Sequence, residues 1–430
     1  MPAAWWTWPV TLSRRASEAR LAVSGQGVGA RQYLLVTSAY WGFTLTDGAL
    51  RMLVLLHFFK LGYSPFTLAF LFLLYEAAGV VANLLGGWLA TRHGISRMLS
   101  VGLSTQIAGF LILSMVSPDW SAWLSVVWVV LAQGVCGVAK DLTKTASKSA
   151  IKLTAGGQSG RLFRWVAWFT GSKNAMKGVG FFLGGLLLDL VGFQGALWLM
   201  AGLLALVLVG VLLLLPPWMG QSQKASKSAR ELFSKSRALN LLAAGRVVLF
   251  GARDVWFVVG VPVFLYAQGW AFTEVGAFLA AWTIGYGLVQ AMAPQFVRKS
   301  TDGLSKEVPA AQWWGIGLAL VPLAIALGVW QGVTPLGPWV VVGLAVFGLA
   351  FAMNSSLHSY LVLAYAGSEK AAEDVGFYYA ANAVGRFLGT LLSGLLYQGF
   401  GLMGCLIGSA AMLAMAVLCT AGLPRQRATP

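Results

Sequence analysis

Long apolar segments alternate with short polar segments along most of the chain. Twelve of the apolar segments can each form a transmembrane helix, because about 20 apolar residues span the hydrocarbon layer of a bilayer. Their predicted bounds are 33–59, 66–90, 98–117, 120–141, 162–188, 194–216, 240–266, 273–295, 310–330, 338–364, 375–398 and 401–423. The pattern predicts an all-α membrane protein with twelve transmembrane helices.

The composition agrees with this class and excludes a soluble domain. Of the 430 residues, 58% are hydrophobic and 10% are charged, whereas soluble proteins carry roughly 25% charged residues. The net charge of +16 requires no nucleic-acid partner, because basic residues of membrane proteins gather in cytoplasmic loops. The three cysteines and three histidines match no disulfide framework and no zinc spacing. We therefore expect the lipid bilayer as a partner, and neither a metal nor a cofactor.

A polar, basic stretch follows the sixth predicted span and divides the spans into two sets of six. The predicted organisation is a tail at 1–30, a six-helix half at 31–216, a basic linker at 217–239, a second six-helix half at 240–423 and a tail at 424–430. With the N-terminus inside, 23 of the 30 lysines and arginines fall in inner segments or at the span ends beside them, and Lys60 alone falls in an outer loop. This asymmetry predicts that both termini are cytoplasmic.

The two predicted halves resemble each other in sequence. At an offset of 207 residues, Phe43 and Asp47 of the first half fall on phenylalanine and aspartate in the second. At an offset of 209, several glycines coincide and Lys177 falls on Arg386. A parallel repeat of six-helix halves is typical of the major facilitator superfamily, in which the site lies at the midplane between the halves.

The polar segment after the second predicted span resembles the loop signature of that superfamily. Gly87, Arg92 and Gly94 match the signature, but Thr91 replaces the usual aspartate and Ile95 replaces a basic residue. The match is therefore degenerate, and a gating salt bridge at Thr91 is not expected.

Charged residues inside the predicted spans include more cations than acids. The cations are Arg51, Lys173, Lys177, Arg246, Arg253 and Arg386, and the acids are Asp47, Glu76 and Asp254. Unpaired buried charge is costly, so the surplus cations predict a multivalent anionic ligand. Span arithmetic places four cations nearest the midplane, namely Lys173, Lys177, Arg253 and Arg386. Structural or snorkelling lysines are the alternative.

Local spacing predicts how some of these charges pair. Asp47 and Arg51 lie one helical turn apart and are expected to pair. Arg253 and Asp254 are adjacent and point about 100° apart on a helix, so we expect them to have different partners. Arg246 lies nearer the cytoplasmic end and is expected to be structural.

Four lysines follow one another at every fourth position from the end of the fourth predicted span, at 140, 144, 148 and 152. They are expected either to anchor the protein at the membrane surface or to form a funnel that attracts an anionic substrate.

Neutral polar residues collect in the tenth and eleventh predicted spans, and the candidates for substrate binding are Asn354, His358, Tyr378 and Asn382. Their side chains can hydrogen-bond a phosphorylated, hydroxylated ligand, or they can bond between helices. A packing role is the more typical one for His358.

Two hypotheses follow from the deep charges. The first is that Lys177 and Arg386 form a clamp on an anion, one from each half, completed by Lys173 and Arg253. The second is that Glu76 couples transport to protons, because its helix offers it apolar neighbours and no cation one turn away. Asp47 and Asp254 are the other coupling candidates. The alternative for Glu76 is a structural ion pair with Arg386 or Lys173.

Four segments resemble the ArsJ-type organoarsenical efflux permeases of the major facilitator superfamily. They are residues 40–51 (YWGFTLTDGALR), 171–182 (GSKNAMKGVGFF), 250–257 (FGARDVWF) and 354–360 (NSSLHSY). The resemblance extends over residues 31–423. It implies a multi-pass permease of the bacterial cytoplasmic membrane that exports 1-arseno-3-phosphoglycerate and gives arsenate resistance. It also implies a functional link to glyceraldehyde-3-phosphate dehydrogenase, which makes this ester when arsenate replaces phosphate.

Two other kinds of function remain for comparison. An organophosphate or sugar-phosphate carrier would also need deep arginines and lysines. A membrane-embedded enzyme would need a nucleophile with its base or a metal cluster, and the sequence contains no such cluster. We therefore expect a transporter, acting as a monomer, and no enzyme.

Overall fold

The computed structural model describes residues 30–82, 94–154, 159–216, 236–296, 300, 304–365 and 371–424. Within these ranges the regular structure is helical throughout. The helices are α2 (Ala30–Lys60), α3 (Pro65–Phe70), α5 (Ile95–Ser114), α6 (Ala122–Thr154), α7 (Ser159–Leu214), α8 (Arg237–Phe257), α9 (Gly260–Ala267), α10 (Phe272–Phe296), α11 (Glu307–Trp330), α12 (Leu336–Tyr365) and α13 (Ala371–Ala421). α3 is the first part of a span, Pro65–Ala82, that is long and apolar enough to cross a membrane.

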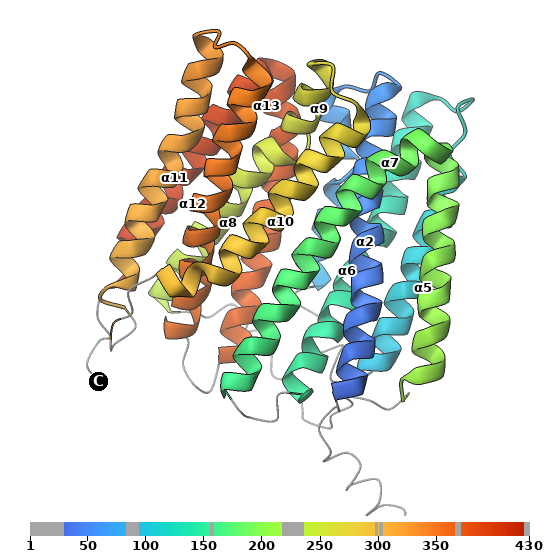
Figure 1. Ribbon diagram of the computed structural model, residues 1–430, viewed down its shortest axis with the longest axis horizontal. Coiled ribbons are helices and arrows are strands. Elements are labelled where there is room, and N and C mark those ends of the chain that lie inside the picture. The colour runs from blue at the N-terminus through green and yellow to red at the C-terminus, as the bar shows by residue number, and fades with distance from the viewer. Residues whose placement is uncertain are drawn as a thin grey trace, which may run out of the picture.

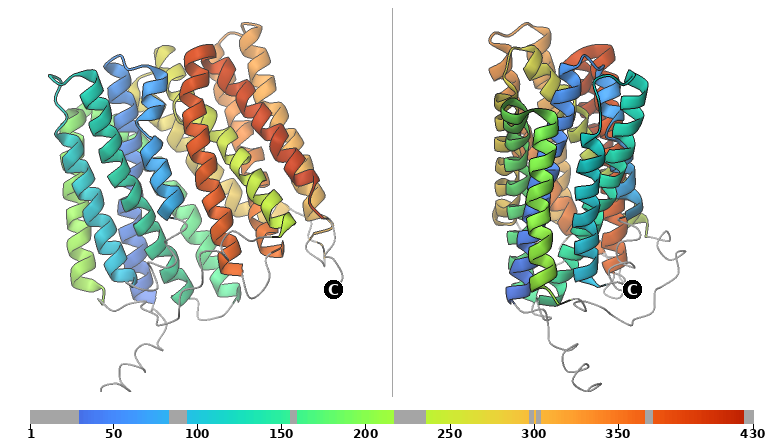
Figure 2. Two further views of the ribbon diagram at one scale, coloured as in Figure 1. Left: turned by 180° about the vertical axis from the view of Figure 1, so that it is seen from behind. Right: turned by 90° about the vertical axis from the view of Figure 1, so that its right-hand side faces the viewer.

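Ten helical spans among the described residues are long and apolar enough to cross a membrane, and two of them are double. The spans within α7 and α13 contain 44 and 42 residues, or more than 60 Å of helix at 1.5 Å per residue, about twice the hydrocarbon thickness. Gly192 and Gly401 interrupt them with φ of 70° and 60°, a region that glycine adopts readily. The chain reverses its direction at both glycines (Figures 1 and 2). The ten spans therefore make twelve crossings, as the sequence predicted.

The helices form two bundles side by side, one from α2 to α7 and the other from α8 to α13 (Figure 1). Two glycines that coincide in the sequence repeat have equivalent places in them. A Cβ on Gly180 of α7 would lie 3.1 Å from Gly48 of α2. A Cβ on Gly389 of α13 would lie 2.7 Å from the Cβ of Asp254 on α8. Close packing at glycine therefore joins the first and fifth crossings of each half.

The halves meet along two pairs of helices. α7 packs on α10, where a Cβ on Gly178 would lie 2.9 Å from the carbonyl oxygen of Ala280. α3 packs on α13, where a Cβ on Gly394 would lie 2.6 Å from the carbonyl oxygen of Pro65. The amide of Phe66 also donates a hydrogen bond to Oε1 of Gln398, at 3.1 Å. These contacts hold the charged side chains of both halves close to one another.

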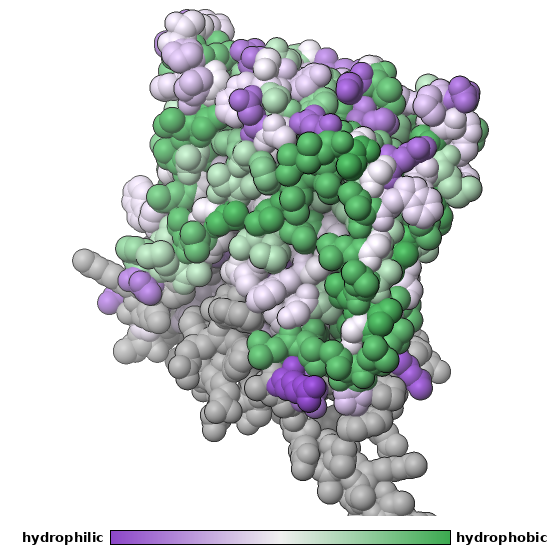
Figure 3. All heavy atoms as spheres, turned by 45° about the vertical axis from the view of Figure 1, so that its right-hand side comes forward, coloured by the Kyte–Doolittle hydropathy of each residue, from purple (hydrophilic) through white to green (hydrophobic). Residues whose placement is uncertain are grey.

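The outer surface suits a bilayer. Apolar side chains cover the middle of the face shown in Figure 3, and hydrophilic residues gather toward its ends. Leu206 and Leu213 are 74% and 78% exposed on α7. Trp123 and Trp330 are also exposed and lie at helix ends, the depth at which tryptophan is enriched in membrane proteins. The protein is therefore a multi-pass membrane protein.

Both ends of the described chain lie at the same end of the bundle (Figures 1 and 2). The predicted N-terminal tail, most of the basic linker and the loop signature up to Arg92 lie outside the described residues, as do the side chains of Lys148 and Lys152.

Candidate functional site

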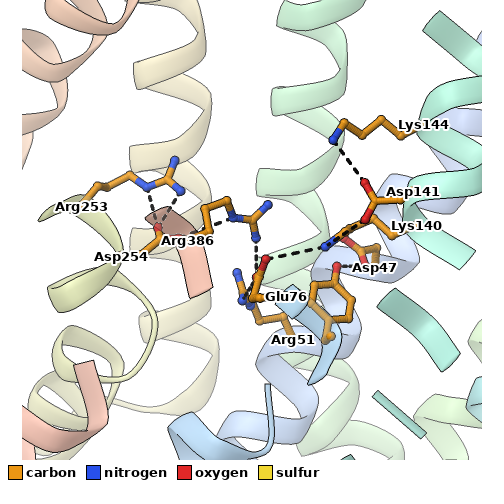
Figure 4. A network of polar contacts seen from close by, with 10 residues as sticks. Asp47, Arg51, Glu76, Lys140, Asp141, Lys144, Arg253, Asp254 and Arg386 are labelled. Carbon is orange, nitrogen blue, oxygen red and sulfur yellow. Dashed lines mark hydrogen bonds and ion pairs between the residues drawn. The ribbon is translucent and has the colours of Figure 1, made fainter. Parts of the chain in front are cut away.

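Glu76 lies at the centre of a network of charged side chains between the halves (Figure 4). Its Oε1 accepts hydrogen bonds from Nη2 of Arg51 and Nη2 of Arg386, each at 2.6 Å. Its Oε2 lies 3.7 Å from Nζ of Lys140. Glu76 is 1% exposed, so one buried carboxylate is shared by three cations.

Helix packing brings these groups together from four crossings. Arg51 lies on α2, Lys140 on α6 and Arg386 on the first part of α13. Aromatic rings cover the cations, since Nζ of Lys140 lies 3.7 Å from the ring centroid of Tyr75 and Arg51 lies 5.3 Å from that of Phe72. Such contacts compensate in part for water lost from a buried cation.

The network continues within the first half through two further acids. Asp141 lies 3.9 Å from Nζ of Lys140 and 3.2 Å from Nζ of Lys144. Asp47 accepts a short hydrogen bond from the hydroxyl of Tyr75. Both acids are at most 5% exposed.

In the second half, Arg253 and Asp254 form an ion pair at 2.6 Å. The other oxygen of Asp254 lies 3.5 Å from Nε of Arg386. Arg386 thus bridges an acid of its own half and Glu76 of the other half. Charges of alternating sign run without a gap from Lys144 to Arg253 (Figure 4).

Two predicted pairings are wrong. Arg51 pairs with Glu76, whereas Asp47 takes the Tyr75 hydroxyl. Arg253 and Asp254 do pair with each other. The reason is the same in both cases: an arginine side chain is long and flexible, so its guanidinium reaches acids that the direction of its Cα–Cβ bond does not indicate.

The surroundings of Glu76 and Lys140 also differ from expectation. Glu76 was predicted to have apolar neighbours, but it contacts cations from three other helices. Its pair with Arg386 is the alternative that the sequence offered. Lys140 was placed at the membrane surface or the cytoplasmic mouth, but it is 9% exposed and contacts Glu76. Only its apolar flank at 135–139 could have indicated this.

Lys173 and Lys177 are two deep cations that this network does not pair. Both lie on the first part of α7 and are half-buried. Neither forms an ion pair within the described residues. Nζ of Lys177 lies 5.7 Å from the ring of Phe181, and its charge is within electrostatic range of Arg386 and also of the acids Asp47 and Glu76. Lys173 is within range of both Arg253 and Arg386.

Several neutral candidates lie elsewhere or are already bonded. Asn354 donates to the carbonyl of Ala311 at 2.8 Å, and this bond joins α12 to α11. His358 is 1% exposed and lies 3.4 Å from the hydroxyl of Thr420. Both have the interhelical role that was their alternative. Asn382 differs, because its Oδ1 is buried without a hydrogen-bond partner among the described residues, one turn from Arg386 on α13.

Arg246 has the structural environment expected for it. It donates hydrogen bonds to the carbonyl and hydroxyl oxygens of Ser355, at 3.3 and 3.0 Å. Its guanidinium lies 3.9 Å from the ring centroid of Phe250 and 4.8 Å from that of Tyr378. Tyr378 is therefore one of the two rings that cover the Arg246 guanidinium.

Comparison with known proteins agrees with this architecture. A family model described as Major Facilitator Superfamily matches residues 33–372. The chain belongs to the major facilitator superfamily. The superfamily match and its apolar helical spans show that it is a membrane transporter.

Solved structures of other major facilitator-like transporters have the same fold. A POT family transporter in complex with 5-aminolevulinic acid is 15% identical, with a TM-score of 0.73 over 93% of this chain and 97% of that chain. A D-xylose–proton symporter is 12% identical, with a TM-score of 0.69 over 92% and 98%. A nucleoside transporter is 17% identical, with a TM-score of 0.67 over 90% and 97%. Comparison with curated proteins gives no match.

Proposed function

We propose that this major facilitator transporter exports an anionic organoarsenical, 1-arseno-3-phosphoglycerate, and so gives arsenate resistance. The observation that carries the proposal is the pair of half-buried lysines, Lys173 and Lys177, which have no carboxylate partner among the described residues. They lie within electrostatic range of Arg386 at the boundary between the halves. Unpaired cations at membrane depth favour a ligand that brings its own negative charge.

A substrate with an anionic group at each end suits this arrangement. Lys177 belongs to the first half and Arg386 to the second, so a bound dianion would touch both halves at once. The guanidinium of Arg386 offers parallel donors to a phosphate or arsenate group, and lysine offers a point charge. Lys173, Arg253 and the amide of Asn382 complete the proposed site. Arg51 would contribute once Glu76 releases it.

The proposal includes features that rest on the resemblance to organoarsenical permeases. The transporter would lie in the bacterial cytoplasmic membrane with both termini in the cytoplasm, and would act as a monomer. Its substrate would be supplied by glyceraldehyde-3-phosphate dehydrogenase. Asp47, Glu76 and Asp254 are the candidates for coupling this transport to protons.

A second candidate function uses the same cations. An organophosphate or sugar-phosphate also carries multivalent negative charge and hydroxyl groups, and it would bind Lys173, Lys177 and Arg386 by the same contacts. The two functions differ in whether arsenic must be present in the substrate.

Uptake into everted vesicles tests the proposal. Vesicles from a host without arsenate exporters would receive radioactive arsenate together with the dehydrogenase, its triose phosphate substrate and its nicotinamide cofactor. We expect arsenic to accumulate only in the complete mixture. Equal accumulation of free arsenate without the dehydrogenase would show that the substrate assignment is wrong. Uptake of labelled 3-phosphoglycerate, without uptake of arsenic, would favour the organophosphate function.

A further inference from the structure

The carboxylate of Glu76 has a position that no other acid of the network shares. Among the ion pairs that the described residues form with one another, its contact with Arg386 is the one that joins the two halves. Glu76 belongs to the first half, and Arg386 lies on α13 in the second. The same oxygen also holds Arg51 of the first half, at 2.6 Å.

This geometry brings two like charges close together. Because Nη2 of Arg51 and Nη2 of Arg386 both lie 2.6 Å from one oxygen, the two guanidinium groups face each other across the boundary between the halves. Without the carboxylate they would repel each other, and burial away from water would strengthen the repulsion. Any state in which the halves close around an empty site would then be disfavoured.

A bound anionic substrate would supply the same negative charge to the same cations. Glu76 already contacts two of the cations that the proposed substrate would bind. A transporter that performs net export must close around its site twice in each cycle, once loaded and once empty. Only the empty step requires a counter-ion from the protein itself.

We propose that Glu76 is the resident counter-anion of the empty transporter. It neutralises Arg51 and Arg386 so that the substrate-free protein closes and reorients, and the substrate displaces it from Arg386 in the loaded step. This inference rests on the proposed export of a multivalent anion. It makes Glu76 the residue that determines whether transport is net export or only exchange.

The test compares Glu76→Gln with a matched control. Glutamine keeps the shape of glutamate and removes its charge. Asp141→Asn is the control, because Asp141 is equally buried, at 1%, and also contacts Lys140, but its ion pairs with Lys140 and Lys144 lie within the first half. Everted vesicles would be prepared empty or preloaded with the complete arsenate and dehydrogenase mixture, and arsenic uptake would be measured in both.

We expect Glu76→Gln to lower uptake into empty vesicles at least tenfold and to retain uptake into preloaded vesicles. The ratio of uptake into preloaded vesicles to uptake into empty vesicles should therefore rise in Glu76→Gln and stay at the wild-type value in Asp141→Asn. A wild-type ratio in Glu76→Gln, or the same change in Asp141→Asn, would overturn the inference. Glu76→Asp retains the charge and should keep the wild-type ratio even if glutamine impairs insertion, and a raised ratio in this variant would also overturn it.

A measurement without substrate separates this inference from the substrate assignment. Ala69 is fully buried and packs against Gly394 where the halves meet, so a cysteine there reacts with a thiol reagent only when that contact opens. The reporter is Ala69→Cys in a chain whose native cysteines are replaced by serine. We expect Glu76→Gln to speed labelling of the empty protein at least tenfold, because repulsion between Arg51 and Arg386 disfavours the state in which Ala69 contacts Gly394. Asp141→Asn should leave the labelling rate unchanged. Unchanged labelling in Glu76→Gln would contradict the inference even if the transported anion proves to be a different one.

Discussion

Replacement of Lys177 by methionine removes one positive charge from the proposed site and leaves the rest of the charge network intact. Methionine has nearly the length of lysine and can keep the apolar contact with Phe181, whose ring lies 5.7 Å from the lysine nitrogen. Lys177 forms no ion pair within the described residues, so the change leaves no acid without its partner. Removal of one member of a buried ion pair would instead cost about 3–5 kcal/mol. We therefore expect normal insertion and stability.

The effect on substrate binding can be estimated from the charge alone. An ammonium group about 4 Å from a unit negative charge interacts by about 4 kcal/mol at an effective dielectric constant of 20. Desolvation of both groups offsets part of this energy, and hydrogen bonds to charged groups contribute about 1.5–3 kcal/mol net. At about 1.4 kcal/mol for each factor of ten, Lys177→Met should weaken substrate binding by about 10- to 150-fold.

The assay is the substrate concentration for half-maximal arsenic uptake into everted vesicles, with thermal unfolding in detergent measured in parallel. Lys60→Met is the matched control, because it removes the same charge at an exposed position. Lys60 lies twelve residues beyond Gly48, which packs against the backbone of Lys177, and this spacing is about 18 Å along a helix. The control should bind substrate normally.

A half-saturating concentration within threefold of wild type in Lys177→Met would refute the reasoning, because it would place the substrate away from this cation. Equal weakening in Lys60→Met would indicate a general effect of protein charge on the local substrate concentration.

Two further predictions follow from the contacts. Arg386→Lys keeps the charge, but an ammonium group cannot contact both Glu76 at 2.6 Å and Asp254 at 3.5 Å as the guanidinium does. We therefore expect about tenfold slower arsenic uptake and lower thermal stability, and unchanged uptake would contradict this. Gly180→Ala would press a methyl group against the backbone of α2 and should destabilise the protein by about 1–3 kcal/mol, measured by unfolding in detergent. Gly202→Ala is the control: its methyl group would meet nothing within 4 Å, so the change should be neutral or slightly stabilising.

The sequence predicted only some of the ion pairs at the site. It placed Glu76 and Arg386 inside apolar spans and offered their ion pair as one alternative, which the structure contains. It failed for Arg51, whose partner is Glu76 on another helix. Which acid a buried arginine contacts depends on helix rotation, on the neighbouring helices and on side-chain conformation, and the spacing within one helix fixes none of these.

Lys140 illustrates a second kind of failure. The fourth apolar segment was predicted to end at residue 141, where charged residues begin, but α6 continues to Thr154. Hydropathy marks the end of the apolar segment, whereas the helix ends where its backbone hydrogen bonds end. Lys140 is therefore well inside the helix and turned toward Glu76.

The sequence by itself determined the fold class and the number of crossings. In lipid, each backbone polar group must be satisfied within the protein, so an apolar segment of about 20 residues has the helix as its one stable form. The tertiary structure alone decided that Arg51, Lys140 and Arg386 converge on Glu76. It also decided that Lys173 and Lys177 form no ion pair with any residue in the described part of the chain. The physical reason is that ion pairing depends on distances of a few ångströms between separate helices, and only their packing sets those distances.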